Sequence, residues 1–136
     1  MGARINFIFR DQEDRPAVVL YSHWGETEWQ RDIAMALEHS KPRWDDTSYF
    51  TRMMISYLIQ DEVLGETGFG IYAINGTSIE QTMQDLGDDS VIIDMSNKTI
   101  VSNVPVDWDD FVQAYLPSGL LSTVGASSAG VGVTLR

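Results

Sequence analysis

Short runs of hydrophobic residues along the chain predict five β-strands. Residues 17–22 (AVVLYS) form a continuous apolar run with β-branched residues, which is typical of a central strand. Residues 91–95 (VIIDM) and 99–103 (TIVSN) flank the stretch SNK and indicate a hairpin with a three-residue loop. Two further strands are predicted at residues 5–9 and 69–74. The second of these follows the glycine-rich stretch GETGFG and ends at an Asn-Gly pair.

Apolar residues at helical spacing predict a first helix after residue 26. Thr27 and Gln30 form a capping box at its start, and Lys41-Pro42 ends it. One face of this helix carries the apolar residues Trp29, Ile33, Ala36 and Leu37.

Two further helices follow from the same spacing. Asp46 or Thr47 caps the second helix, which we expect to be buried on two sides because its apolar residues spread beyond one stripe: Tyr49, Phe50, Met53, Met54, Ile55, Tyr57, Leu58 and Ile59. Asp107 caps the last helix and Pro117 stops it, and its apolar stripe contains Trp108, Phe111, Val112, Tyr115 and Leu116. The polar residues 77–90 predict only a short helical turn, capped by Thr77 or Ser78.

This order of elements predicts a single α+β domain, in which a mostly antiparallel sheet carries helices packed on one face. We expect the domain to span residues 1–116. Residues 117–136 differ from it in composition, because they are rich in Gly, Ser and Val and carry no charge before Arg136. Such a segment is expected to dock, either on its own domain or on a partner chain in a homo-oligomer; we favour the partner chain.

Composition and charge exclude several classes of function. The chain has no cysteine and two histidines, so disulfides and thiolate metal sites are excluded and a metal or other cofactor is not expected. The formal net charge of −11 disfavours binding to duplex nucleic acid. No long uncharged apolar run occurs in the first 116 residues, so no membrane span is indicated and an intracellular protein is expected.

Chemistry-bearing residues are concentrated where predicted strands end and helices begin, and these points meet at one rim of such a layer. Arginine supplies planar donors for phosphate or carboxylate, aromatic rings offer stacking surfaces, and histidine donates or accepts near neutral pH. Together they suit a small anionic aromatic ligand such as a nucleotide derivative. The candidate ligand-binding residues are His23, Trp24, Arg43, Trp44, Arg52, Thr67 and Phe69.

Each of these residues also has a purely structural interpretation. Trp24 and Trp44 are more commonly packing residues than a stacking pair. Arg43 can form a local ion pair with the adjacent Asp45 and Asp46, and Arg52 can pair with Asp61 or Glu66. The stretch GETGFG has neither the spacing of a dinucleotide-binding loop nor a phosphate-binding lysine.

Catalysis has less support in the sequence. His23 with Asp45 or Asp46 would form a base and its orienting carboxylate, but no nucleophile is indicated. Ser22 is next to His23 on a predicted strand, so the two side chains point to opposite faces. We therefore assign no catalytic residue.

Several motifs resemble a family of small uncharacterised proteins of tailed phages and prophages. They are VLYSHWG, RWDD, Tyr49 and Arg52 in the following helix, GETGFGI and VIIDMSNKTI, and together they span residues 17–101. The family pattern often has a second glycine where Glu26 stands. The resemblance implies a phage protein that acts in the cytoplasm of an infected bacterium, and it brings no assigned activity.

The sequence thus favours a non-enzymatic binding protein that sequesters a small nucleotide-derived signal of host immunity. Two alternatives remain open: an acidic inhibitor that binds a host protein, and a small hydrolase based on His23.

Overall fold

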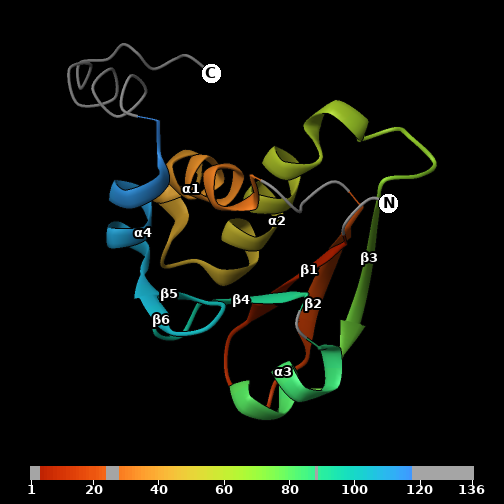
Figure 1. Ribbon diagram of the computed structural model, residues 1–136, viewed down its shortest axis with the longest axis vertical. Coiled ribbons are helices and arrows are strands. Elements are labelled where there is room, and N and C mark those ends of the chain that lie inside the picture. The colour runs from red at the N-terminus through yellow and green to blue at the C-terminus, as the bar shows by residue number, and fades with distance from the viewer. Residues whose placement is uncertain (1–3, 24–27, 88, 118–136) are drawn as a thin grey trace.

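The computed structural model describes residues 4–23, 28–87 and 89–117 and contains one six-stranded mixed sheet with four helices packed against it (Figure 1). The predicted α+β single domain is confirmed. The strands are β1 (Ile5–Arg10), β2 (Ala17–Ser22), β3 (Phe69–Ile74), β4 (Ser90–Asp94), β5 (Thr99–Val101) and β6 (Pro105–Asp107).

The strands are arranged in the order β3-β2-β1-β4-β5-β6. All neighbouring strands are antiparallel except β1 and β4, which run parallel in the centre of the sheet. A parallel pair needs a long crossover, and here the crossover contains β2, β3 and three of the helices. The outer strands differ in length, since β3 has six residues and β6 has three.

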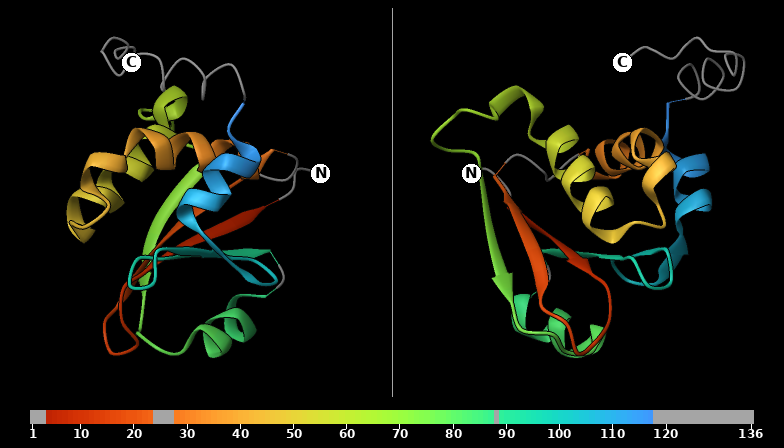
Figure 2. Two further views of the ribbon diagram at one scale, coloured as in Figure 1. Left: turned by 90° about the vertical axis from the view of Figure 1, so that its left-hand side faces the viewer. Right: turned by 180° about the vertical axis from the view of Figure 1, so that it is seen from behind.

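Three helices cover one face of the sheet and one helix covers the other (Figure 2). The three-helix layer consists of α1 (Trp29–His39), α2 (Thr47–Leu58) and α4 (Trp108–Tyr115), while α3 (Ile79–Leu86) packs alone on the opposite face. Two short 3₁₀ turns, η1 (Lys41–Arg43) and η2 (Gln60–Glu62), follow α1 and α2.

Alternation along the central strands produces a core on each face. The larger core lies beneath the three-helix layer and contains Phe7, Phe9, Leu20, Val91 and Ile93 of the sheet with Ile33, Leu37, Phe50, Met54, Trp108 and Phe111 of the helices. The smaller core joins Ile8, Val19 and Ile92 to Ile79, Met83 and Leu86 of α3. Strands buried on both faces explain why 17–22 and 91–93 are continuously apolar.

The position of α3 differs from the prediction that helices pack on one face. The prediction holds for α1, α2 and α4. The segment 77–90 is polar on average, but Ile79, Met83 and Leu86 are spaced by four and three residues and so form one apolar stripe. Ser78 caps α3 as expected, because its hydroxyl accepts a hydrogen bond from the Gln81 N–H at 3.1 Å.

The other helix caps agree with the sequence only in part. Asp46 caps α2 by accepting a hydrogen bond from the Tyr49 N–H at 3.3 Å. Asp107 is the N-cap residue of α4 but makes no capping hydrogen bond through its side chain. The expected cap Thr27 lies outside the described residues, and Glu28 is the N-cap residue of α1.

The prediction that α2 is buried on two sides is wrong. Only Phe50 and Met54 are fully buried, whereas Tyr49 is 51% exposed and Arg52 faces solvent. The apolar residues of its C-terminal half are half-buried at the edge of the three-helix core. The helix lies at the border of the layer, so part of its apolar surface remains in contact with water.

The predicted hairpin is formed by β4 and β5, but its turn has four residues, 95–98. Asp94 organises the turn, because its Oδ1 accepts hydrogen bonds from the Ser96 and Asn97 N–H groups at 3.1 and 3.4 Å. Lys98 completes the turn with a positive φ of 55°. Strand β6 had no signal in the sequence, because it is short and begins with a proline.

A buried charged pair connects the carboxyl ends of the parallel strands. Arg10 and Asp94 are paired in the register of β1 and β4, and Arg10 Nη1 lies 3.9 Å from Asp94 Oδ1. The Arg10 guanidinium also donates two hydrogen bonds to the Thr77 carbonyl, at 3.1 and 3.2 Å. These contacts attach the segment that leads into α3 to the centre of the sheet.

Two predictions concern features beyond the folded elements. Among the described residues, no helix is long and apolar enough to cross a membrane. The predicted docking tail falls on residues 118–136, which lie outside the described part of the chain, so its docking stays a prediction.

Candidate functional site

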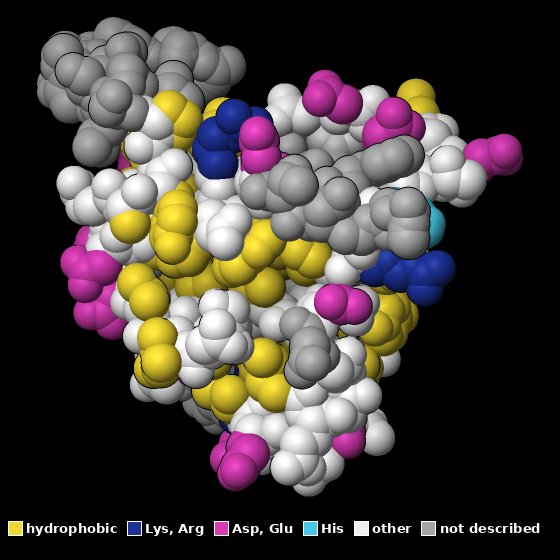
Figure 3. Space-filling view, viewed as in Figure 1, with side chains coloured by type: hydrophobic (Ala, Val, Ile, Leu, Met, Phe, Trp, Pro, Cys, Tyr) yellow, Lys and Arg dark blue, Asp and Glu magenta, His cyan; other side chains and the backbone are white. Residues whose placement is uncertain are grey.

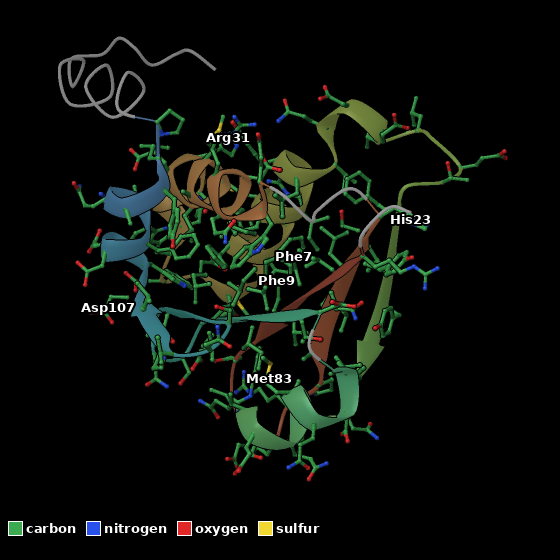
Figure 4. All side chains as sticks on the ribbon, viewed as in Figure 1. Phe7, Phe9, His23, Arg31, Met83 and Asp107 are labelled. Atoms are coloured by element: carbon green, nitrogen blue, oxygen red, sulfur yellow. The ribbon has the colours of Figure 1, made fainter. Side chains whose placement is uncertain are left out.

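Three of the predicted ligand-binding residues meet at the carboxyl end of β2. His23 directly follows β2, and its N–H donates a hydrogen bond of 2.9 Å to the Gly68 carbonyl. Ser22 pairs with Phe69 across the antiparallel strands β2 and β3, so Thr67 and Phe69 lie at the same rim as His23 (Figure 4). Trp24 lies outside the described residues.

Phe69 and Thr67 differ in what they face at this rim. The half-buried Phe69 packs against the three-helix core, whereas Thr67 is exposed. Ser22 is buried, and its side chain points to the face opposite that of His23 because the two residues are adjacent on an extended chain.

Trp44 acts as a packing residue in this structure. Its Nε1–H donates a hydrogen bond to the Leu37 carbonyl at 3.1 Å, and its ring meets Trp108 edge to face with 5.2 Å between centroids. Trp108 itself stacks on Phe50 at 4.6 Å. The three rings connect η1, α2 and α4, which agrees with the structural interpretation of Trp44.

Arg43 is engaged locally. Its Nη1 lies 3.5 Å from Asp46 Oδ2, and its guanidinium lies 4.5 Å from the centre of the Tyr49 ring. The neighbouring Asp45 pairs with Lys98 of the β4–β5 turn at 2.9 Å. Arg43 and Trp44 therefore belong to the β5–α4 side of the molecule, several strands from β3.

Arg52 is exposed on α2, and among the described residues it has no ion pair. The structure thus divides the candidate residues between two places. His23, Thr67 and Phe69 share the β2–β3 rim, whereas Arg43 and Trp44 lie beside α4. The grouping of His23 with an arginine of η1 or α2 stays a prediction.

A different set of polar side chains lies on the sheet face that carries α3. One row crosses four neighbouring strands, because Tyr21 pairs with both Asn6 and Gly70, and Asn6 pairs with Ser90. Directly paired residues point to the same face of a sheet. The next row contains the apolar residues Val19, Ile8 and Ile92, which α3 covers.

Hydrogen bonds and ring contacts join this row to its neighbours. The Tyr21 hydroxyl lies 3.3 Å from His23 Nδ1, and the two rings are 5.4 Å apart. The Tyr72 hydroxyl donates to Asn6 Oδ1 at 3.4 Å, and Tyr72 is 42% exposed. We call the four residues Asn6, Tyr21, His23 and Tyr72 the tyrosine face.

The Tyr21 hydroxyl and His23 Nδ1 lie within hydrogen-bond distance, and which of the two groups donates depends on the tautomer of the imidazole. When the neutral ring accepts the Tyr21 O–H at Nδ1, its own proton is on Nε2. When the proton is on Nδ1, the imidazole N–H donates to the phenol oxygen.

Gly70 leaves space beside Tyr21. A Cβ at this position would lie 4.0 Å from Tyr21 Cδ2, which is ordinary van der Waals contact, so the backbone of β3 is open to a ligand next to the phenol ring. At the other end of the row, Ser90 is buried and its hydroxyl has no hydrogen-bond partner among the described residues. A buried hydroxyl is normally satisfied by protein, water or ligand.

Arg4 adds positive charge to this end of the sheet. Ile5 pairs with Ser22, so extending the register by one residue places the exposed Arg4 opposite His23. Figure 3 shows basic side chains beside the histidine at the rim of the molecule, next to a band of hydrophobic side chains over the strands. The tyrosine face supplies aromatic rings, an amide and an imidazole, and the neighbouring Arg4 adds a cation that favours an anion.

The structure also describes a groove elsewhere, of about 390 Å³, between the end of β3 and α3. Asn75, Thr77, Thr82 and Asp85 supply its polar groups, and Asp85 accepts a hydrogen bond from Gln81 Nε2 at 2.8 Å. The lining contains a carboxylate and no cationic side chain, which does not suit an anionic ligand. The groove is therefore a weaker candidate for the predicted chemistry.

The hydrolase alternative loses its expected orienting carboxylates. Asp45 pairs with Lys98 and Asp46 caps α2, so neither is placed to orient His23. Among the described residues, no group of three or more His, Asp or Glu side chains is placed to hold a metal ion.

Sequence reasoning proposed His23 and did not single out Asn6, Tyr21 or Tyr72, which the structure places beside it. Tyr21 and His23 alternate with the buried Leu20 and Ser22, and this alternation was the available signal. Comparisons with protein-family models, curated proteins and solved structures give no significant match, so the geometry alone carries the functional argument.

Proposed function

We propose that this protein binds a small anionic aromatic ligand, such as a nucleotide derivative, on the tyrosine face and holds it without turnover. The observation that supports the proposal most is the grouping of Asn6, Tyr21, His23 and Tyr72 on one face of the sheet, with Gly70 leaving space beside the ring of Tyr21.

The chemistry of the face matches the parts of such a ligand. A planar base stacks on the exposed ring of Tyr72, and stacking of this kind contributes about 1–3 kcal/mol per base. The Asn6 amide offers both a donor and an acceptor for the edge of the base. Arg4 attracts the anionic group, and an N–H of the His23 imidazole offers it a hydrogen bond.

Binding without turnover is supported by the positions of the two carboxylates that a hydrolase based on His23 would use. Asp45 pairs with Lys98, and Asp46 caps α2. A phenol hydroxyl at 3.3 Å orients the ring but does not stabilise an imidazolium as a carboxylate does. The sequence also marks no nucleophile.

The biological setting comes from the resemblance to proteins of tailed phages and prophages. We infer that the protein acts in the cytoplasm of an infected bacterium, where it lowers the free concentration of a nucleotide-derived immune signal. The net charge of −11 is consistent with a small ligand rather than duplex nucleic acid as the partner.

A recovery experiment tests this proposal. Purified protein is incubated with a panel of nucleoside monophosphates and cyclic di- and trinucleotides, separated from unbound nucleotide, denatured and analysed by mass spectrometry. We expect intact nucleotide at no more than one per site. Loss of nucleotide over many turnovers, abolished by His23→Ala, would instead establish the hydrolase.

The same preparation distinguishes the inhibitor alternative. An acidic protein that occludes a host factor retains a protein from a bacterial lysate and retains no nucleotide from the panel. That result would overturn the proposal of a small-molecule ligand.

A further inference from the structure

The outer edge of β3 is an open sheet edge. β3 pairs with β2 on one side, and among the described residues no strand pairs with its other side. Its sequence FGIYAI has no charged residue and no proline, and Ile71 and Tyr72 are 58% and 42% exposed. Proteins normally protect such edges with lysine, proline, a bulge or a short strand, because open edges pair with other chains.

The opposite edge shows that protection. β6 has three residues and begins with Pro105, which has no N–H to donate to an added strand. The two edges therefore differ in their capacity to accept another strand. Only β3 offers a length of backbone that matches an ordinary strand.

The C-terminal sequence supplies a segment that suits this edge. Residues 118–136 lie outside the described residues, so the argument rests on their sequence. Val131, Val133 and Leu135 alternate with Gly132 and Thr134, which is the period-two pattern of a strand with one apolar face. The segment contains no proline, and its one charged residue is Arg136.

Charge favours the tail over a folded surface as the occupant. The chain carries a net charge of −11, and none of the acidic residues lies in β3 or in residues 118–136. Docking two folded bodies edge to edge brings like charges together, which is unfavourable. An extended tail reaches the edge of a neighbour while the two acidic bodies remain apart.

We propose that residues 131–135 of one copy add as a strand to the outer edge of β3 of a second copy. The chain leaves the described structure at Pro117, after α4, which follows the opposite edge strand β6. Residues 118–130 span up to about 43 Å when extended, at roughly 3.3 Å per residue. Reciprocal exchange of the two tails closes a dimer with two-fold symmetry.

This proposal concerns the sheet edge and does not depend on the ligand of the tyrosine face. The test is light scattering after size-exclusion chromatography of the full chain, loaded at a concentration on the order of several hundred micromolar. We expect a dimer for the wild type and a monomer for Ile71→Lys, because an edge lysine blocks strand addition. Val133→Pro is expected to give a monomer as well, since proline interrupts the added strand.

Matched variants control for folding and for nonspecific effects of charge. Val104 is 63% exposed away from β3, so Val104→Lys adds the same charge at a similar exposure and is expected to leave the dimer intact. Ser122→Pro places a proline in the tail outside the alternating stretch and is also expected to leave it intact. Circular dichroism verifies that each variant is folded.

Three results would overturn the proposal. A monomeric wild type means that the tail does not dock in trans. A dimer that survives Ile71→Lys means that the interface lies elsewhere. A dimer that is lost in Ile71→Lys but survives Val133→Pro means that β3 pairs with a second β3 rather than with the tail.

Discussion

Arg10 and Asp94 face each other across the parallel strands β1 and β4, with Nη1 and Oδ1 3.9 Å apart and both side chains buried. Asp94 also accepts hydrogen bonds from the backbone of the β4–β5 turn, and Arg10 donates to the carbonyl of Thr77 before α3. One buried pair thus connects the hairpin, the central strands and the helix beneath the sheet.

Asp94→Ala is expected to lower the free energy of unfolding by roughly 3–5 kcal/mol, because it leaves the buried Arg10 charge without its carboxylate. Urea denaturation measures the loss. Arg15→Ala is the matched control, since Arg15 forms an exposed pair with Asp11 at 3.3 Å and its removal should cost less than about 1 kcal/mol. Equal losses in the two variants would contradict the structural role of the Arg10–Asp94 pair.

Trp44→Phe tests whether Trp44 is a packing residue. The variant keeps an aromatic ring against Trp108 but removes the donor to the Leu37 carbonyl. We expect a loss of about 1 kcal/mol in stability, the usual net value of one hydrogen bond, because that carbonyl still accepts from the Ser40 hydroxyl at 3.2 Å. Ligand affinity should not change, and a large fall in affinity would return Trp44 to the binding site.

Asp32 gives a prediction for pH. Burial raises the pKa of Asp32, the Arg31 charge opposes the rise, and Glu28 adds to it. Folded protein therefore binds this proton more tightly than unfolded protein does. The contribution of Asp32 to the free energy of unfolding is fully present below the unfolded pKa of about 3.9. This contribution is lost as the pH rises through the raised pKa of the folded protein.

Asp32→Asn should accordingly be slightly more stable than the wild type at pH 7. The gain should be within about 0.5 kcal/mol, because Asp32 is only partly shielded from water and its residue remains largely exposed, and it should vanish below about pH 4. Thermal unfolding of both proteins from pH 3 to pH 8 measures the difference. A gain that grows on acidification would contradict the sign.

Arg4 gives a prediction for salt. If it attracts the anionic group of the ligand, affinity should fall as ionic strength rises, and Arg4→Ala should weaken binding and flatten that dependence. Arg15→Ala is the control, because Arg15 is exposed and pairs locally with Asp11. A wild-type affinity that does not change with salt concentration would argue against a charged ligand.

Local sequence patterns predicted much of the fold. The apolar runs located strands at 5–9, 17–22 and 91–95, because strands buried in the centre of a sheet need apolar residues on both faces. The edge strand at 69–74 was located by its apolar residues between a glycine-rich stretch and an Asn-Gly pair. Helical spacing located α1, α2 and α4 for a similar reason, since each buries one stripe of side chains in the three-helix core.

Local patterns do not predict which distant segments of the chain pair in the sheet. Nothing in residues 5–9 or 91–95 indicates that β1 and β4 run parallel, because direction depends on the crossover between them. The apolar stripe of α3 was not recognised in the sequence, because the residues between its apolar positions are mostly polar. The three residues of β6 have no strand pattern of their own, and the strand is defined by its pairing with β5.

The candidate site shows the same limit. His23 was proposed from the sequence because a histidine at the end of a predicted strand is a candidate for chemistry. Tyr21 and Tyr72 were not proposed, because their position beside each other depends on the register of β2 and β3, in which Tyr21 pairs with Gly70. The sequence favoured packing over ligand stacking for Trp44, and its ring contact with Trp108 agrees with a packing role.

Calorimetric titration of three proteins with the tightest-binding nucleotide of the panel tests the central claim most directly. Tyr72→Leu removes a side chain of the tyrosine face that is 42% exposed. Tyr115→Leu removes a tyrosine of α4 with a similar exposed fraction, 45%. We predict that Tyr72→Leu weakens binding about tenfold or more, as loss of one stacked ring implies, and that Tyr115→Leu binds like the wild type. Wild-type affinity in Tyr72→Leu, or no binding of any nucleotide to the wild type, would contradict the proposed site.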